Sequence, residues 1–210
     1  MDESTQGGQQ DKPKVKASRG RRLLIAVGLL FVLAAVGLLG QRVVASFFAG
    51  KTTQGVLSQL NERMPESYVG WSKPKIKPKD TSMATENVQG YDYIGTIAIP
   101  TLDIDLPVNA VLDSDRLTLS PCCYSGSYVT DDLIICGEGY STHFGNINTV
   151  GIKDEVRLAA VDGVMHRYIV SNVEIDRLED IDKIFDDWDL ALFTFNADGT
   201  VQVVRCIRTQ

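Results

Sequence analysis

The stretch ALFTFNADGTVQVVRCI at residues 191–207 sets the fold class of this chain. Two runs of apolar and β-branched residues, 191–195 and 200–207, lie on either side of the sequence Asn-Ala-Asp-Gly at 196–199. Turn-forming residues between two such runs are typical of a β-hairpin. The stretch therefore predicts two neighbouring antiparallel strands joined by a tight turn.

Short segments of the same kind recur upstream and extend the prediction to a mainly β protein. Each combines apolar and β-branched residues and ends near a glycine, a proline or an aspartate. The predicted strands cover residues 93–99, 102–108, 133–136, 155–159 and 167–173, and the acidic residues 178–185 indicate a short helix or loop. Roughly seven or eight short strands separated by turns favour a closed β-barrel or a sandwich.

Charge is unevenly distributed along the 210 residues. Residues 1–42 contain seven Lys or Arg and three Asp or Glu, whereas residues 43–210 contain 14 and 24, so the net charges are +4 and −10. An acidic domain lacks the basic face that neutralises nucleic-acid phosphates. We therefore expect no nucleic-acid partner.

Residues 23–40, LLIAVGLLFVLAAVGLLG, are uncharged, apolar and preceded by lysines and arginines. Eighteen helical residues span about 27 Å, close to the hydrocarbon thickness of a bilayer. Basic residues before the span predict a cytoplasmic N-terminus. We expect a single-pass signal-anchor over 23–42 that places the following residues outside the cell. A signal peptide cleaved near Val43-Val44-Ala45 is the alternative.

These features divide the chain into four parts. Residues 1–22 form a basic cytoplasmic tail, and 23–42 form the transmembrane anchor. Residues 43–90 contain an extracellular helix and a Lys-Pro linker at 73–79, which is expected to be extended and solvated. Residues 91–210 form the globular β domain.

Four stretches, kept in order and spacing, resemble the sortase family over residues 91–206. They are YIGTIAIP at 93–100 with LPV at 106–108, YSGS at 124–127 leading to DDLIICG at 131–137, GEGYSTHFG at 137–145, and WDLALFTF at 188–195 followed by VVR at 203–205. The resemblance implies a closed eight-stranded barrel with short helices on the outer face of a Gram-positive bacterium's membrane. Active relatives cleave a sorting signal through a cysteine acyl-enzyme, which an amine then resolves.

Two of the three catalytic residues implied by the resemblance are replaced. Glu138 stands at the histidine position and Phe195 at the cysteine position, while Arg205 is retained. Acyl transfer needs a nucleophile and a stabiliser for the oxyanion, and Phe195 cannot attack a carbonyl. Glu138, Thr194, Phe195 and Arg205 are the predicted peptide-groove residues. Arg205 either donates to a peptide carbonyl or carboxylate, or forms a structural salt bridge.

A relocated catalytic pair is the alternative, with Cys136 as the nearest thiol and His143 as its base. A position in an apolar strand favours an inert, buried Cys136, and His143 is more typical of a loop-capping or surface residue. His166, next to the Asp162-Gly163 turn, is predicted to lie at the surface. Arg205 and Cys206 are predicted to face opposite sides of one strand.

The four cysteines, Cys122, Cys123, Cys136 and Cys206, match no zinc-binding spacing. A disulfide bond from Cys122 or Cys123 to Cys136 or Cys206 stays open for a chain outside the cell. The resemblance implies no redox cofactor, although some sortases bind calcium. Asp131, Asp132 and the acidic residues 176–187 are interpreted as solvated carboxylates rather than calcium ligands.

Three functional hypotheses follow from the sequence. The first is a membrane-anchored, catalytically inactive sortase homologue that binds a sorting-signal-like peptide or another partner at the cell surface. The second is an active sortase-like cysteine peptidase or transpeptidase that uses Cys136 and His143. The third is a structural interaction domain without a peptide groove.

Overall fold

The computed structural model describes residues 51–70, 81–177 and 188–209. They belong to a compact unit that spans Val44–Gln210. Three sequence predictions fall outside the described residues: the signal-anchor at 23–42, the extended Lys-Pro linker at 73–79 and the short helix or loop at 178–185. Within the described ranges, no helix combines the length and the apolar character needed to cross a membrane.

The described chain is mainly β. Its strands are β1 (Val69–Gly70), β2 (Glu86–Val88), β3 (Tyr91–Ile99), β4 (Ile104–Asn109), β5 (Cys122–Ser125), β6 (Leu133–Cys136), β7 (Glu155–Ala160), β8 (Val164–Arg177), β9 (Leu190–Phe195) and β10 (Thr200–Arg208). Residues 51–63 are helical, and η1 (Pro100–Leu102), α2 (Ser114–Leu119) and η2 (Ile147–Thr149) are short. All seven predicted strands are present, while β1, β2, β5 and α2 were not predicted.

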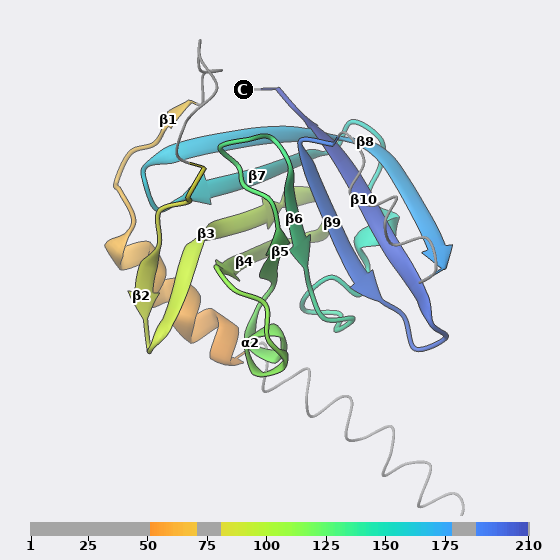
Figure 1. Cartoon of the computed structure of the whole chain (residues 1–210), viewed down its shortest axis with the longest axis horizontal. Helices are drawn as coiled ribbons and strands as arrows, with labels where there is room; N and C mark the ends of the chain where they lie inside the picture. The colour runs from red at the N-terminus through yellow and green to blue at the C-terminus, as the bar shows by residue number, and fades with distance from the viewer. Residues whose placement is uncertain (1–50, 71–80, 178–187, 210) are drawn as a thin grey trace, which may run out of the picture. The chain divides into compact units, whose positions relative to one another are not determined.

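Eight of the ten strands close into a barrel (Figure 1). Starting from β3, each strand pairs with the next in the order β3, β4, β5, β6, β9, β10, β8 and β7, and β7 pairs back with β3. The β4–β5 and β6–β9 pairs are parallel and the other six are antiparallel. The short strands β1 and β2 extend the ring at its rim by pairing with β8 and β3. The predicted closed eight-stranded barrel is thus confirmed.

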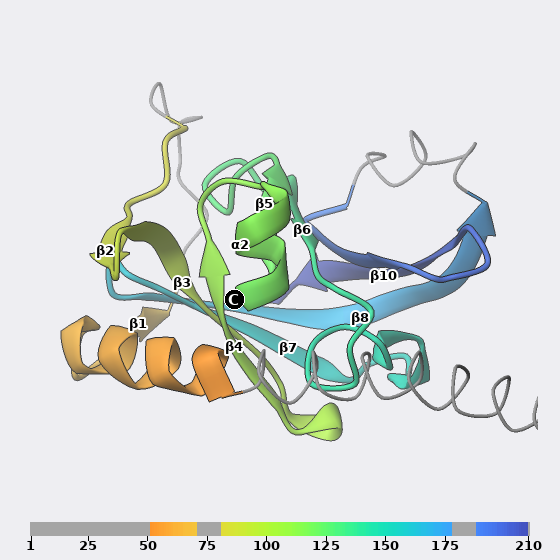
Figure 2. The same cartoon turned by 90° about the horizontal axis from the view of Figure 1, so that it is seen from below.

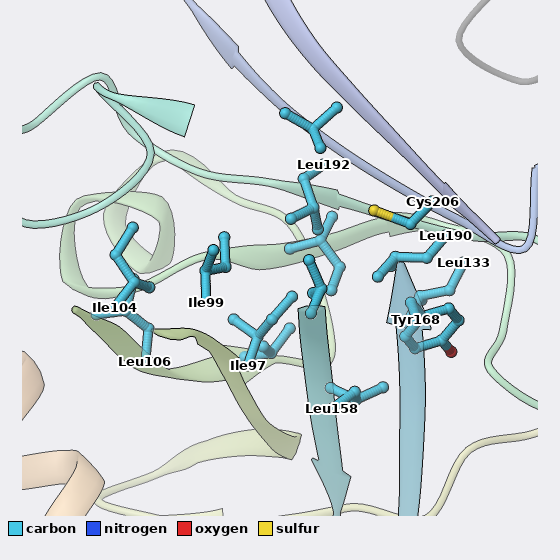
Figure 3. Close-up of a cluster of buried hydrophobic side chains, with 14 of the residues drawn as sticks. Ile97, Ile99, Ile104, Leu106, Leu133, Leu158, Tyr168, Leu190, Leu192 and Cys206 are labelled. Atoms are coloured by element: carbon cyan, nitrogen blue, oxygen red, sulfur yellow. The ribbon is translucent and has the colours of Figure 1, made fainter. Parts of the chain in front are cut away.

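The barrel interior is filled by every second side chain of its strands, as the two-residue period of a β-strand requires. Figure 3 shows aliphatic residues of this core converging from different strands. Leu192 and Val204 belong to it, and so does Cys206, whereas Arg205 faces the other side of β10. The predicted opposite orientation of Arg205 and Cys206 is confirmed.

A second apolar cluster, which we call the outer cluster, covers the outer face of β6, β9 and β10. It consists of Ile134, Cys136, Ala191, Phe193, Val201 and Val203, and Leu112 and Leu117 beside and within α2 pack against it. These residues alternate along their strands with the residues of the interior core. Both faces of these three strands are therefore apolar, which explains why their sequences read as nearly continuous hydrophobic runs.

The helix at residues 51–63 packs on the barrel through one apolar face (Figure 2). Val56, Leu60 and Met64 contact a third cluster that contains Val88 of β2 and Tyr93 of β3. The spacing of these positions by four residues places them on one side of a helix. The segment that follows the predicted anchor is therefore part of the folded domain.

A polar cluster lies at one end of the barrel interior, around Arg208. The guanidinium donates to Asp131 at 2.5 Å, to the Tyr128 carbonyl at 2.7 Å and to His166 Nδ1 at 2.5 Å. It also lies 4.8 Å from the centre of the Tyr168 ring. The prediction that His166 is at the surface is wrong, because this side chain is 1% exposed and alternates along β8 with outward-facing residues.

Candidate functional site

The register of β6, β9 and β10 brings Glu138 and Phe195 together. β6 pairs with β9 in parallel, with Ile135 opposite Leu192 and Cys136 opposite Phe193. Continuing this offset by two residues places Glu138 level with Phe195, at a strand spacing of about 4.8 Å. The loop backbone stays close there, because a Cβ at Gly139 would lie 3.2 Å from the Phe195 carbonyl oxygen.

On the other side of β9, the residue opposite Phe195 is Val201 and not Arg205. Glu138 lies two residues beyond the end of β6, next to the paired residues Phe195 of β9 and Val201 of β10 in the continued register. We call these three residues the site row. Val201 is completely buried in the outer cluster. The sequence resemblance did not identify it. The pairing follows from the hydrogen bond that the Asn196 amide donates to the Thr200 carbonyl, which leaves residues 197–199 in the loop.

Arg205 lies opposite Ala191, four residue pairs from Phe195. That separation corresponds to about 13 Å along the strands. The Arg205 side chain is 5% exposed, and it forms salt bridges to Glu174 at 2.5 Å and to Asp176 at 3.5 Å. Hydrogen bonding to Arg205 holds the pKa of Glu174 below its ordinary value. Of the two roles predicted for Arg205, the geometry favours the structural salt bridge.

Thr194 does not line an accessible surface, which corrects its prediction as a groove residue. Its neighbours Phe193 and Phe195 face outward, so Thr194 faces inward with Leu190 and Leu192. The side chain is 0% exposed, and its hydroxyl oxygen has no hydrogen-bond partner. Thr194 therefore belongs to the barrel end beneath the loop that carries Glu138.

Next to the site row, three aromatic residues form what we call the aromatic face: Tyr124, Phe193 and Phe195. The Phe193 ring packs edge-on against Tyr124 at 5.2 Å and against Phe195 at 5.5 Å between centroids. Phe193 is buried, whereas Tyr124 is 38% and Phe195 45% exposed. These two partly exposed rings, supported by a buried third, form an apolar patch that the other described elements leave partly uncovered.

The loop at residues 137–145 is held firmly against the barrel. The Gly137 amide donates to the Phe193 carbonyl at 3.0 Å, and the Phe144 amide donates to the Glu138 carbonyl at 3.1 Å. Gly137 must be glycine, because a Cβ there would lie 2.5 Å from the Phe144 ring. The backbone around Glu138 is thus fixed, and its side chain is partly exposed.

The alternative pair Cys136 and His143 is not brought together by a hydrogen bond among the described residues. Cys136 is 1% exposed in the outer cluster, and burial raises the pKa of its thiol to about 12. His143 is 0% exposed, and its Nε2 lies 3.3 Å from the Thr53 hydroxyl of the helix at 51–63. Its role is to link the loop to that helix, in a buried rather than a surface position.

We expect the buried His143 to make the protein sensitive to acid. Burial lowers its pKa from 6.5 to about 4, so the unfolded chain binds the proton more readily than the folded one. The stability that the neutral, buried His143 contributes is fully present above pH 6.5 and is lost as the pH falls toward 4. Between pH 7 and pH 5, unfolding in urea should reveal a loss of about 2 kcal/mol from this residue.

The matched variant is His143→Gln, which keeps a hydrogen-bonding group near Thr53 but does not titrate. Its stability is expected to fall by about 2 kcal/mol less than that of the natural chain over the same pH interval. Both proteins retain His166, whose pKa burial lowers to about 3, so its contribution cancels in the comparison. Identical pH profiles would contradict the assignment of His143 as a buried neutral group.

Within the described residues, no group of three or more His, Cys, Asp or Glu side chains is arranged to hold a metal ion. Asp131 pairs with Arg208, and Asp132 accepts from the Ser127 amide at 2.8 Å. These two carboxylates have structural partners. Most of the acidic residues at 176–187 lie outside the described chain.

Comparison with solved structures identifies the fold. Sortase A from Corynebacterium diphtheriae matches with a TM-score of 0.52 and 20% identity, over 84% of this chain and 96% of that one. Sortase C1 from Streptococcus agalactiae matches with a TM-score of 0.51 and 18% identity, over 59% and 71%. Sortase C1 from Streptococcus suis matches with a TM-score of 0.50 and 17% identity, over 56% and 73%. No protein-family model and no curated protein sequence matches the chain.

The chain is a closed β-barrel protein of the sortase fold. The resemblance found in the sequence is confirmed at the level of the fold. This particular barrel carries a glutamate, a phenylalanine and a valine in its site row.

Proposed function

We propose that this chain is a non-catalytic, sortase-fold protein that binds an extended peptide on its aromatic face. The observation that carries the proposal is the site row, in which the scaffold around Glu138 and Phe195 is kept while no thiol is present. A phenylalanine ring offers contact area but no nucleophile. We place the protein at the outer face of a Gram-positive cell membrane, held by the apolar segment 23–40.

Exposed aromatic side chains support the binding role. Large exposed apolar groups that lie next to each other mark interaction sites more often than scattered ones do. Tyr124 and Phe195 are exposed rings that both pack against the buried Phe193. Rigid aromatic rings dominate the energetics of many interfaces.

The charges of the side chains around the aromatic face indicate which class of peptide should bind. Glu138 lies in the site row. Glu174 and Asp176 lie beyond β10 on the same side of the barrel, with side chains 43% and 26% exposed, and they share the single positive charge of Arg205. The net charge of −10 after residue 42 has the same sign. An acidic surround favours basic ligands, so we propose a peptide that presents apolar side chains next to a lysine or arginine.

The test is binding of the full chain, in lipid nanodiscs, to an array of fluorescent extended peptides. Replacing Phe195 with alanine is expected to weaken binding of the best peptide by about tenfold or more. The change should alter the free energy of unfolding by less than about 1 kcal/mol, because the ring is half exposed. A structural domain without a groove would bind no peptide or bind equally well without the ring.

Ile207→Ala is the matched control for this experiment. Ile207 is 41% exposed on the outer side of β10, similar to the 45% of Phe195, but it lies six residues from Val201. It should leave binding unchanged. Equal losses of peptide affinity in the two variants would show that the peptide contacts the barrel surface broadly and does not bind at the aromatic face.

A further inference from the structure

Two of the four cysteines lie directly opposite each other on neighbouring strands. In the antiparallel pair of β5 and β6, Cys122 is the register partner of Cys136. Directly opposed residues point to the same side of a sheet, and Cys136 belongs to the outer cluster. Cys122 therefore faces outward beside it. Both are free thiols in this structure.

The spacing of such a pair suits a disulfide bond. Opposed Cα atoms in antiparallel strands are about 4.5 or 5.5 Å apart, within the range of about 4.4–6.8 Å that disulfides span. Cβ atoms must approach by about 1 Å from their usual cross-strand separation. The register of β5 already shifts just after Cys123, so this strand is irregular where the adjustment is needed.

The remaining cysteines cannot form this bond. Cys123 lies opposite Ile135 and belongs to the interior core, as does Cys206. The strands β5 and β10 that carry these two residues are separated by β6 and β9. Among the pairings that the sequence leaves open, the register selects one.

We propose that Cys122 and Cys136 form a disulfide bond that ties β5 to β6 when the chain folds in an oxidising compartment. The two thiols lose two protons and two electrons as the sulfur–sulfur bond forms. A disulfide oxidant, such as oxidised glutathione or the oxidised cysteine pair of a thiol oxidoreductase, accepts both electrons and leaves as two thiols.

The bond closes before the fold is complete. Both side chains are at most 1% exposed, and burial raises the pKa of each thiol to about 12, so neither is reactive in the folded protein. Exchange with an oxidant therefore takes place while β5 and β6 are still accessible. Cys136 is two residues before Glu138, so the bond anchors the strand that leads into the site row.

The experiment starts from the full chain, reduced and unfolded, which is refolded in a glutathione buffer with excess oxidised glutathione. Free thiols are then alkylated under denaturing conditions and counted by intact mass. The natural chain contains four cysteines and is expected to carry two alkyl groups. Proteolysis without reductant should release one cross-linked species that joins the fragments around residues 122 and 136.

Single variants separate this pairing from the others. Cys123→Ala should keep the bond and carry one alkyl group, whereas Cys122→Ala should carry three. Reduction should lower the melting temperature of the natural chain by on the order of 10 °C and leave that of Cys122→Ala unchanged. Four alkyl groups on the refolded natural chain, or a bond that includes Cys123 or Cys206, would overturn the proposal.

Discussion

Replacement of Arg208 with alanine is expected to lower the free energy of unfolding by about 3–5 kcal/mol, because it leaves a buried charge unpaired. The Arg208 side chain is 4% exposed and ion-paired with Asp131, whose side chain is 23% exposed. The same guanidinium fills the barrel end against His166 and the Tyr168 ring. Its removal therefore leaves a carboxylate without its counter-ion and an unfilled space in the core.

Urea unfolding followed by tryptophan fluorescence measures this loss. Arg167→Ala is the control, since Arg167 pairs with Glu155 at 2.5 Å but both side chains are more than 40% exposed. Exposed pairs contribute less than about 1 kcal/mol. Adding Asp131→Asn to Arg208→Ala should recover part of the loss. If Arg208→Ala and Arg167→Ala lowered the free energy of unfolding by similar amounts, the polar cluster would not stabilise this end of the barrel.

The second large expected effect is a gain of catalytic activity. The combined substitutions Glu138→His, Phe195→Cys and Val201→Arg are expected to raise the rate of peptide cleavage about 10²–10⁴-fold above the uncatalysed rate, which the natural protein should not exceed. A thiolate at position 195 would attack the peptide carbonyl, forming a carbon–sulfur bond. The imidazolium at position 138 would give its proton to the leaving amine as the carbon–nitrogen bond breaks, and the guanidinium at 201 would donate to the oxyanion. Water would then hydrolyse the thioester and release the thiol.

Two control variants test whether the expected cleavage depends on the residues of the site row. The same combination with Phe195→Ala in place of Phe195→Cys lacks the thiol and should not cleave. The pair Glu138→His and Phe195→Cys without Val201→Arg retains only Arg205, which lies four residue pairs away. It should be about 10²–10³-fold slower than the triple variant. Equal rates would show that Arg205 reaches the site row. Circular dichroism spectra must establish that each variant is folded.

Much of the barrel could be predicted from local sequence, because its central strands are apolar on both faces. The hairpin at 191–207 and the strand at 133–136 were located nearly to the residue. β5 was missed because its Cys-Cys-Tyr-Ser sequence has no β-branched residue. β1 and β2 are only two and three residues long, too short to show a period.

The site could be predicted only in part, because its geometry depends on the pairing of strands. Glu138 and Phe195 were identified, and each lies two residues beyond the last pair of the β6–β9 register, Cys136 with Phe193. The sequence favoured Arg205 because of its number of residues from Phe195. Which residue of β10 lies opposite Phe195 depends instead on the strand register, and that residue is Val201. The predicted turn at 196–199 would place Thr200 opposite Phe195, whereas the Asn196 amide donates to the Thr200 carbonyl and the register places Val201 there.

The two histidines show a different limit. His143 lies in a polar loop and His166 follows the Asp162-Gly163 turn, and both settings favour exposure, but tertiary contacts bury both side chains. His143 is covered by the helix at 51–63 through Thr53, about 90 residues away in the chain. His166 is enclosed by Arg208 from β10. No window of sequence around either residue contains its partner.

The central claim, binding without catalysis, is tested most directly on the natural full chain in nanodiscs with the peptide array. Bound and unbound peptides are recovered and weighed by mass spectrometry, with and without prior treatment of the protein with a thiol-alkylating reagent. We expect peptides with apolar residues next to a lysine or arginine to bind and to be recovered intact in both cases. Cleavage or amine transfer that the alkylating reagent abolishes would contradict this account and assign the chemistry to one of the cysteines.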